Sequence, residues 1–543
     1  MKQNDFLFFV TIVAYTILSP LLSFSQRQQR EEYILTGENF RIYPSAVTQT
    51  ETFITRHPTN ATILFASANT INLNTGFVSE GIYVSTNAGN TWSGSDTCKG
   101  SPVNFHRGDP GIAIDKNGTF ILIRLGFSPG LYSHFSTDNG MTWSSQKTIA
   151  TDDQERAALV SDGNSASSYY GRTYAAWVRY APPYPMVFSF TDNGGNSWSA
   201  PAQINNPTRR GQGGEMVIGA NGTVSVCWAG VTSTSPFTED FVGFASSING
   251  GATWTVSENA FDMNGIAGTL PHKSNIRVNG LPKIDTDKSG GIRNGWLYIV
   301  TTEKNLSPAG TDPDIIFHRS TDNGNSWSEG IRVNQDGLSN GKIQYFPAIH
   351  VDDFRGVNVL YYDDRNTASD SAAVFLSRSI DGGTTWSDFQ ISDHNFQPKP
   401  IGGLGQGYQG DNISLTSIGD TLFPVWMDNS TGIYQLWSSR VVISSLVSLN
   451  DVDIVSAFSL EQNYPNPFNP VTVIRYQLSV NSVVTLKVYD VLGKEVATLI
   501  HNRLLEEGKH EVQFDASGLP GGVYVYRLST GKFSGVKKFV VLK

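Results

Sequence analysis

The sequence predicts an all-β fold built from a repeated unit, and two observations carry this prediction. A turn signature, Ser/Thr-x-Asp/Asn-x-Gly-x-Ser/Thr-Trp, occurs six times in the 543 residues; its copies end at Trp92, Trp143, Trp198, Trp254, Trp327 and Trp386. Two apolar runs of strand length precede each copy. A period of roughly 50 to 60 residues is typical of supersecondary units that bury their apolar faces only against neighbouring units.

Backbone chemistry explains the composition of the turn. The side-chain oxygen of Asp or Asn accepts hydrogen bonds from nearby main-chain N–H groups, and the glycine adopts the positive φ that other residues avoid. The hydroxyl before the tryptophan holds the far side of the turn, and the indole folds underneath as an apolar plug. The signature resembles the Asp-box, or BNR repeat, of the sialidase-like β-propellers. This resemblance places the turns on outer strands, away from the active centre, and implies that all six are structural.

The strand patterns number seven rather than six. The first apolar run of each unit opens near Glu51, Asp109, Arg156, Glu215, Leu281, Phe346 and Asp411. The seventh unit lacks the turn that follows in the others, and a propeller whose last blade is one strand short usually borrows that strand from the other terminus. Residues 33–42 are the candidate for this strand. The sequence therefore favours seven blades over six, with a loop insertion around residues 261–277.

Composition divides the chain into four segments. Lys2, an apolar run at 6–22 and small residues at 23–25 predict a signal peptide over residues 1–25. The propeller is expected at 26–442 and a polar linker at 443–457. Short strands separated by Gly and Pro turns then predict a small Ig-like β-sandwich at 458–543. No other stretch is long enough to span a bilayer, so we expect export without a retained transmembrane segment.

The last segment resembles the C-terminal sorting domain of the type IX secretion system. The resemblance rests on Asn463-Tyr-Pro-Asn-Pro-Phe-Asn-Pro, Tyr489-Asp-Val-Leu-Gly-Lys, Gly522-Val-Tyr-Val-Tyr-Arg and the basic residues Lys537, Lys538 and Lys543. It implies an export address, so residues 458–543 would bind the type IX secretion machinery and take no part in the chemistry of the cargo. The protein would then be secreted or attached to the outer cell surface. An ordinary accessory sandwich is the alternative.

Charge and cysteine content exclude some classes of function. The net charge of −9 provides no basic face for a nucleic acid. The only two cysteines, Cys98 and Cys227, make no metal site, and a disulfide between them is left open. No cofactor is predicted, although the clustered oxygens of Asp363 and Asp364, or those of the turns, are of the kind that hold structural calcium.

Polar residues gather where a propeller binds its ligand. Loops that lead into the innermost strands and loops that leave the second strands share one face around the central channel, which we call the mouth. The first kind carries Glu51, Arg107, Asp109, Glu155, Arg156, Arg209, Arg210, Glu215, Tyr345, Tyr408 and Asp411. The second kind carries Arg124, Arg179, Glu303, Asp363, Asp364, Arg365 and Asp428. Charges of both signs therefore converge on the mouth.

The sialidase resemblance implies specific roles for six residues. Sialidases hold the substrate carboxylate with three arginines, attack with a tyrosine that a glutamate activates, and use an aspartate as acid/base. By chain order, Asp109 would be the acid, Glu215 the activator and Tyr345 the nucleophile. Arg41, Arg124 and Arg365 would bind the substrate. Arg41 is chosen because Phe40-Arg-Ile-Tyr-Pro is similar to the family motif Phe/Tyr-Arg-Ile-Pro, from which it departs by an inserted tyrosine.

Each of these assignments has a structural alternative. The two acids can cap turns or satisfy loop amides, Arg365 can pair with neighbouring aspartates, and the other three residues can pack within blades. Two functions therefore stay open: a secreted glycoside hydrolase of exo-α-sialidase type, and a non-catalytic surface propeller that binds glycan or protein. Three guanidiniums around one carboxylate position, with Tyr and Glu in contact, would favour the enzyme. Mutually paired charges would favour binding.

Overall fold

The computed structural model describes residues 32–103, 106–402, 407–445, 459–478, 482–491, 493–506, 508–530 and 534–543. The expected signal peptide, residues 1–25, lies outside this part of the chain, as does most of the expected linker. Contacts divide the chain into two units, Met1–Leu446 and Val447–Lys543. Each unit is described by itself.

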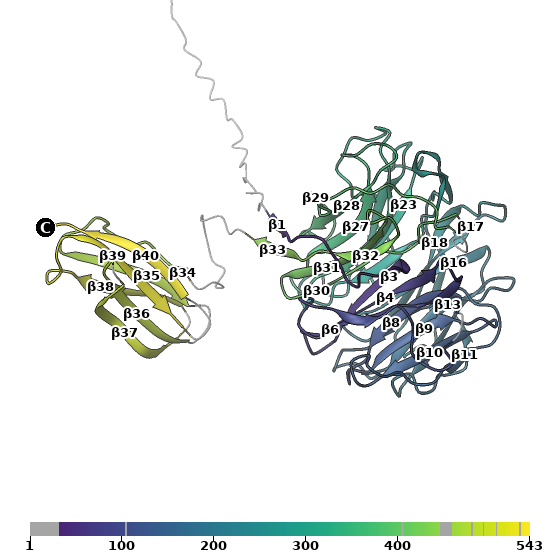
Figure 1. Ribbon diagram of the computed structural model, residues 1–543, viewed down its shortest axis with the longest axis horizontal. Coiled ribbons are helices and arrows are strands. Elements are labelled where there is room, and N and C mark those ends of the chain that lie inside the picture. Colours follow the sequence, from purple (N-terminus) through teal and green to yellow (C-terminus); the bar gives the residue numbers. More distant parts are fainter. Residues whose placement is uncertain are drawn as a thin grey trace, which may run out of the picture. The chain divides into compact units, whose positions relative to one another are not determined.

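The first unit is a β-propeller of seven blades (Figure 1). Each innermost strand contacts the innermost strand of the next blade, and the last contacts the first, so the sheets close into a ring. The fold predicted from the repeats is confirmed, with seven blades rather than six. The innermost strands are β3 (Thr48–Arg56), β8 (Gly108–Ile114), β12 (Ala158–Ser161), β16 (Arg210–Ile218), β22 (Lys283–Thr286), β26 (Gln344–Val351) and β30 (Ser414–Ile418).

The remaining strands of each blade follow outward with antiparallel pairing. The second strands are β4 (Leu64–Asn72), β9 (Phe120–Leu125), β13 (Thr173–Val178), β17 (Val224–Val231), β23 (Leu297–Glu303), β27 (Val357–Asp363) and β31 (Thr421–Asp428). The third strands are β6 (Ile82–Ser85), β10 (Leu131–Ser136), β14 (Met186–Thr191), β18 (Glu239–Ser247), β24 (Asp314–Ser320), β28 (Ala373–Ser379) and β32 (Gln435–Ser438). The outer strands are β7 (Ser93–Ser95), β11 (Lys147–Ala150), β15 (Ala202–Gln203), β19 (Thr255–Asp262), β25 (Ile331–Arg332), β29 (Ser387–Gln390) and β2 (Phe40–Arg41).

The N-terminal segment closes the seventh blade. β2 pairs with β32, with Phe40 opposite Ser438 and Arg41 opposite Trp437. β1 (Glu32–Thr36) pairs with β33 (Val441–Ser445) at the edge of the same sheet. The short strand β5 (Phe77–Glu80) adds to β4 in the first blade. Closure by the segment predicted at 33–42 therefore ties the two ends of the propeller together.

The repeated turns join third and outer strands, at the edge of each blade. In the second copy, the Ser136 hydroxyl accepts a hydrogen bond of 2.9 Å from the Gly140 N–H, and Asp138 Oδ1 accepts one of 2.9 Å from the Thr142 N–H. The tryptophan of one blade packs on an aromatic ring of the preceding blade, as Trp143 does on Phe65 at 6.0 Å. The same contact recurs at Trp254–Phe188, Trp327–Phe244 and Trp386–Phe317. The plug thus holds neighbouring blades together.

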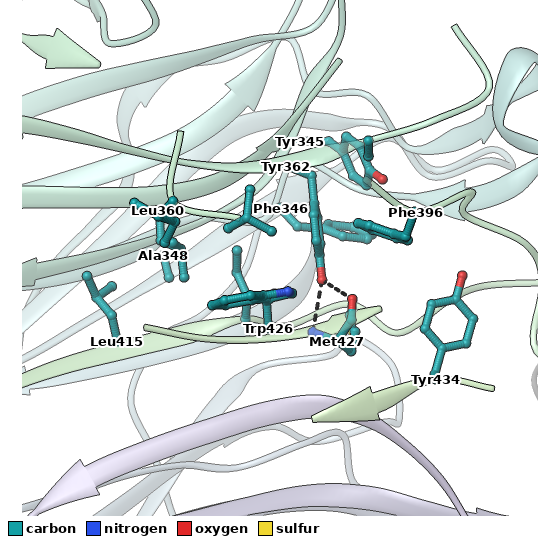
Figure 2. Close-up of a cluster of buried hydrophobic side chains, with 14 of the residues drawn as sticks. Tyr345, Phe346, Ala348, Leu360, Tyr362, Phe396, Leu415, Trp426, Met427 and Tyr434 are labelled. Carbon is teal, nitrogen blue, oxygen red and sulfur yellow. Dashed lines mark hydrogen bonds between the residues drawn. The ribbon is translucent and has the colours of Figure 1, made fainter. Parts of the chain in front are cut away.

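The insertion between the fourth and fifth turns forms a small hairpin. It consists of β20 (Gly268–Leu270), the 3-10 turn η1 (Pro271–Lys273) and β21 (Ile276–Val278). Its apolar side chains join a buried cluster that includes Tyr345, Phe346 and Tyr362 of the sixth blade (Figure 2). The Lys273 ammonium is fully buried and donates to Asp364 Oδ2 at 2.8 Å and to the carbonyls of Ser369 and Ser371. All three donors of this lysine are satisfied, so it fixes the tip of the hairpin to the sixth blade.

The second unit is a β-sandwich of two antiparallel sheets. One contains β34 (Ser459–Leu460), β35 (Val471–Leu478) and β38 (Gly508–Asp515); the other contains β37 (Glu495–Leu505), β36 (Ser482–Tyr489), β39 (Gly522–Ser529) and β40 (Ser534–Val541). Alternate residues of both sheets fill the core, in which Phe539 packs against Tyr524 and Tyr526. The Asn463 N–H donates a hydrogen bond to the Tyr526 hydroxyl at 2.8 Å. The first sorting motif is therefore built into this core.

Both cysteines of the propeller are free and buried. Cys98 and Cys227 belong to separate core clusters, one between the first two blades and one between the fourth and fifth. The disulfide that the sequence left open is absent.

Candidate functional site at the mouth of the propeller

A cavity of about 820 Å³ opens at the mouth of the propeller. The starts of innermost strands and the loops of five blades line it, together with the hairpin insertion. From the predicted mouth residues it gathers Glu51, Arg107, Asp109, Glu155, Arg156, Arg210, Tyr408 and Asp411. None of the residues predicted at the exits of the second strands lines it. Innermost strands and the loops that lead into them therefore form much of the wall, and Asn69, Ile71 and Leu125 of second strands also line it.

A β-bulge at the start of four innermost strands shapes this site. The register shifts at Thr50/Phe53, Gly108/Gly111, Gln212/Glu215 and Tyr345/Ala348. At each bulge one residue has positive φ: Glu51 at 53°, Asp109 at 59°, Gly213 at 63° and Phe346 at 52°. Positive φ is costly for residues with a Cβ, and such strain is found most often at functional sites. In the first two blades this strained position carries an acid that faces the cavity.

Three carboxyl groups converge on the cavity floor. Burial, with the negative charges of Asp109 and Asp411 added, raises the pKa of Glu51 well above its usual value. Burial likewise raises the pKa values of Asp109 and Asp411, against the lowering effect of nearby arginines. The Glu51 and Asp109 side chains share a hydrogen bond. Burial of acids beside one another favours their protonated forms, which is the direction of all three pKa shifts.

Glu155 lies at the edge of the same group. Burial, followed by the charges of Asp109 and Asp411, raises its pKa to about 7. A carboxyl group with this pKa is half protonated at neutral pH and can either give or take a proton there.

Cations of the site are paired with buried acids. Arg156 and Lys283 both bind the Glu215 carboxylate, Lys283 at 2.6 Å. Burial pushes the pKa of Glu215 up, but these two cations outweigh it and the pKa is lowered. Arg277, from β21, binds Asp411 Oδ2 at 3.0 Å and lies 4.4 Å from the centre of the Tyr408 ring. The hairpin thus delivers one of the arginines.

Tyr408 and His106 complete the polar wall. The negative charge of Glu51, with burial, raises the pKa of the Tyr408 hydroxyl. His106 binds Glu80 Oε2 through Nδ1 at 2.7 Å, and its Nε2 has no hydrogen-bond partner among the described residues. A carboxylate on Nδ1 fixes the tautomer that leaves Nε2 as an acceptor.

The structure places two of the six assigned residues at the site. Asp109 lines the cavity, and Glu215 lies beneath it as the anion that binds Arg156 and Lys283. Tyr345 is fully buried in the core of the sixth and seventh blades (Figure 2). Its hydroxyl lies 3.5 Å from Gln409 Oε1. The catalytic roles given to these residues stay predictions.

The three assigned arginines do not line the cavity. Arg41 is on the outer strand β2, and Arg124 is 1% exposed, with its guanidinium bound to His134 and Gln146 of its own blade. Arg365 binds Asp363 at 2.6 Å and also Asp388, both in the sixth blade. Their roles as substrate clamp also stay predictions.

Glu51, Tyr408 and Asp411 were placed at the mouth by the sequence but received no catalytic role. The signal that could have singled them out is their position: Glu51 matches Asp109 at the start of an innermost strand, and Tyr408 and Asp411 precede the innermost strand of the blade next to Glu51. Among the residues described, no group of three or more His, Cys, Asp and Glu has the arrangement to hold a metal ion.

The C-terminal unit identifies the route of export. Residues 462–542 match the family described as secretion system C-terminal sorting domain. This unit is a type IX sorting domain. It implies interaction with the type IX secretion machinery, and the protein is exported to the cell surface or secreted. Within the described part of the chain, no helix has the length and apolar character needed to cross a membrane.

The solved structures that are similar to the chain include the following three proteins. A protein of unknown function from Dyadobacter fermentans is 13% identical, with a TM-score of 0.45 over 76% of this chain and 99% of that one. An ulvan lyase of polysaccharide lyase family PL25 is 13% identical, with a TM-score of 0.47 over 74% and 95%. A leech intramolecular trans-sialidase is 11% identical, with a TM-score of 0.41 over 66% and 71%. No curated protein sequence matches the chain significantly.

Proposed function

We propose that the propeller is an exported glycoside hydrolase of sialidase type whose active site is the cavity at the mouth. The observation that carries the proposal is the group formed by Glu51, Asp109 and Asp411, which line one cavity and whose pKa values are all raised by burial. A carboxyl group with a raised pKa suits the role of the general acid that cleavage of a glycosidic bond requires. The volume of the cavity, about 820 Å³, is large enough for a sugar unit.

The residues of the floor suit a retaining mechanism with a tyrosine nucleophile. Asp109 gives its proton to the leaving-group oxygen as the glycosidic bond breaks. Tyr408 forms the new bond to the anomeric carbon, and its hydroxyl proton passes to Glu51, whose charge acts on Tyr408 in the structure. Asp109 then takes a proton from a water that attacks the anomeric carbon, the bond from that carbon to the Tyr408 oxygen breaks, and Glu51 returns its proton to this oxygen. This mechanism keeps Asp109 as the acid, as the sequence predicted. Its nucleophile is Tyr408 and its activating glutamate is Glu51, both of which line the cavity.

A second candidate function is non-catalytic glycan binding. It is favoured by the pairing of Arg156 with Glu215 and of Arg277 with Asp411, because these arginines are engaged before any substrate carboxylate arrives. A binding protein needs the cavity and its polar wall but no proton transfer.

A fluorogenic sialoside assay on the protein without residues 1–25 tests the proposal. We expect release of the fluorophore, with loss in Tyr408→Phe, which keeps the ring and removes the nucleophilic oxygen. Arg365→Ala tests the clamp predicted from the sequence; we expect it to retain activity because its partners are in its own blade. No release by the wild-type protein rejects this substrate class, and binding of a sialoside without release supports the second candidate.

A further inference from the structure

Arg210 occupies a pocket of aromatic rings beside the acidic floor. It is the first residue of β16 and lines the cavity. The centre of its guanidinium lies 4.6 Å from the Phe237 ring, 4.9 Å from Tyr184 and 5.0 Å from Tyr180. Arg210 Nη2 donates to the Tyr180 hydroxyl at 2.9 Å. Rings on its flanks hold the planar guanidinium in one orientation.

The charge of Arg210 is balanced differently from that of its neighbours. Arg156 and Arg277 bind buried carboxylates, and the adjacent residue in the chain, Arg209, binds Asp240 at 3.2 Å. Among the described residues, Arg210 forms no ion pair with any carboxylate, and its Nε is buried without a hydrogen-bond partner. A buried donor of a permanent cation that lacks a partner is unfavourable unless a ligand supplies an acceptor.

The surroundings suit a sugar chain. Tyr180 is 44% exposed, so part of its ring is open to a ligand, and Phe237 and Tyr180 both line the cavity. Arginine binds carboxylate and sulfate through two parallel N–H donors, whereas aromatic rings pack against the apolar faces of sugars. Arg210 and the acids of the floor therefore offer two different kinds of contact within one cavity.

We propose that Arg210, Tyr180, Tyr184 and Phe237 form a second subsite, which binds an anionic group on a sugar next to the unit held at the acidic floor. The ligand class is an acidic oligosaccharide of at least two units, whose charge is a carboxylate or a sulfate ester. The position of the cleaved unit rests on the proposed function; binding at Arg210 does not.

Binding measured by calorimetry tests this subsite on Asp109→Asn protein, so that a ligand is not cleaved during the titration. The probes are oligogalacturonides of two to four units for the carboxylate, sulfated galacto-oligosaccharides of the same lengths for the sulfate ester, and neutral malto-oligosaccharides. We expect one acidic series to bind more tightly than the neutral one. In Arg210→Gln that affinity should fall about tenfold to a hundredfold, the usual effect of one charge-assisted contact.

Arg209→Gln is the matched control, because it removes an adjacent arginine that already has an acid partner. We expect a change of less than about twofold in that variant, since an exposed ion pair contributes little. Arg210→Lys keeps the positive charge but lacks the planar guanidinium, so it should bind the acidic series with intermediate affinity. This variant replaces Arg210→Gln in the test if Arg210→Gln is poorly folded. The inference is overturned if neither acidic series binds, or if the substitutions at 209 and 210 weaken binding equally. If acidic oligosaccharides bind through Arg210 while the wild-type protein releases no fluorophore from the sialoside, the proposed hydrolase is rejected and the subsite stands.

Discussion

The turns at the blade edges and the mouth of the propeller both depend on carboxyl groups, but their pKa values shift in opposite directions. In the turns, hydrogen bonds from Thr142 and Ser136 lower the pKa of Asp138 to about 2, and bonds from Ser326 lower that of Asp322. At the mouth, burial next to other acids raises the pKa values of Glu51 and Asp109. The turn carboxylate accepts hydrogen bonds from nearby donors, whereas the carboxyl groups at the mouth are buried close to other acidic side chains.

This difference separates scaffold from site. A carboxylate with a full set of N–H and O–H donors stabilises the fold in its charged form. Buried acids that face one another destabilise their charged forms, and such arrangements are retained where a proton has to be transferred or a charged ligand bound. In the sequence, acids of both kinds are simply Asp and Glu residues. Only their neighbours in space show which kind each one is.

The largest expected effect comes from removing a mouth carboxyl group. Asp109→Asn should lower turnover of a cleaved substrate by about 10² to 10⁴-fold, the usual contribution of a general acid. The thermal midpoint at pH 8 should stay equal or rise, because the variant no longer buries a charge and asparagine tolerates the φ of 59° at this position. Steady-state rates and a thermal melt of the same preparation check both parts. Retained turnover would exclude Asp109 as the acid.

Loss of a buried ion pair should also lower stability more than loss of an exposed one. Lys273→Met leaves the buried Asp364 without its cation, and loss of one partner of a buried pair typically destabilises by about 3–5 kcal/mol. Adding Asp364→Asn removes the isolated charge and keeps an oxygen for the Ile343 N–H, so stability should partly return. Denaturant unfolding measures each variant.

The exposed ion pair between Arg56 and Asp353 is the control for Lys273. Asp353→Asn should change the free energy of unfolding by less than about 1 kcal/mol, because both side chains are more than a third exposed and water screens them. Equal losses in Lys273→Met and Asp353→Asn would show that the lysine does not hold the hairpin.

The contributions of Glu155 at the mouth and of Asp138 in a turn to the free energy of unfolding should depend on pH in opposite directions. Glu155 has a pKa of about 7 in the folded protein against an ordinary value of 4.5, so the folded state holds this proton more tightly. Its contribution is complete below about pH 4.5 and is lost as the pH rises towards 7, with a slope of at most about 1.4 kcal/mol per pH unit. Asp138 behaves in the reverse sense: its contribution is present above 3.8 and is lost as the pH falls through about 2.

Unfolding by denaturant between pH 4.5 and 8 measures this dependence. Glu155→Gln should flatten the decline, because glutamine binds no proton in either state. Asp138→Asn should leave the curve in this range unchanged, since the Asp138 carboxyl group is already ionised in both states there. A decline as steep in Glu155→Gln as in the wild-type protein would contradict the raised pKa.

Local patterns made the scaffold predictable from the sequence. Each repeated turn makes most of its hydrogen bonds within eight residues, so its signature can be recognised without knowledge of the fold. The seven strand patterns and the closing segment at 33–42 follow from the repeats, and β2 pairs with β32 as expected. The sorting motifs are local in the same sense.

The candidate site depended on information that is not local. At the bulge between Tyr345 and Ala348 the register shifts, and a slip of one residue turns a side chain to the other face of the sheet, which is why Tyr345 points into the core. Arg124 and Arg365 find partners in outer parts of their own blades, such as Gln146 and Asp388. Pairing at these distances in the sequence leaves no pattern in a single chain.

The smallest effect is expected for Asp138→Asn, because another copy of the turn already has asparagine at this position. In the first turn Asn87 stands where Asp138 stands in the second: its Oδ1 accepts from the Thr91 N–H at 2.9 Å, and its Nδ2 donates to the Thr91 hydroxyl at 2.8 Å. Asp138→Asn should therefore keep both contacts, with the direction of the side-chain hydrogen bond to Thr142 reversed. The free energy of unfolding at pH 7 should change by less than about 0.5 kcal/mol.

Ser136→Ala is the comparison within the same turn. It removes the buried oxygen that accepts from the Gly140 N–H, and an unsatisfied buried donor costs about 1–3 kcal/mol. Denaturant unfolding of the two single variants ranks them. A larger loss in Asp138→Asn than in Ser136→Ala would mean that the carboxylate charge, rather than the hydrogen-bond pattern, holds the turn, and the contrast with the mouth would then lie only in the direction of the pKa shifts.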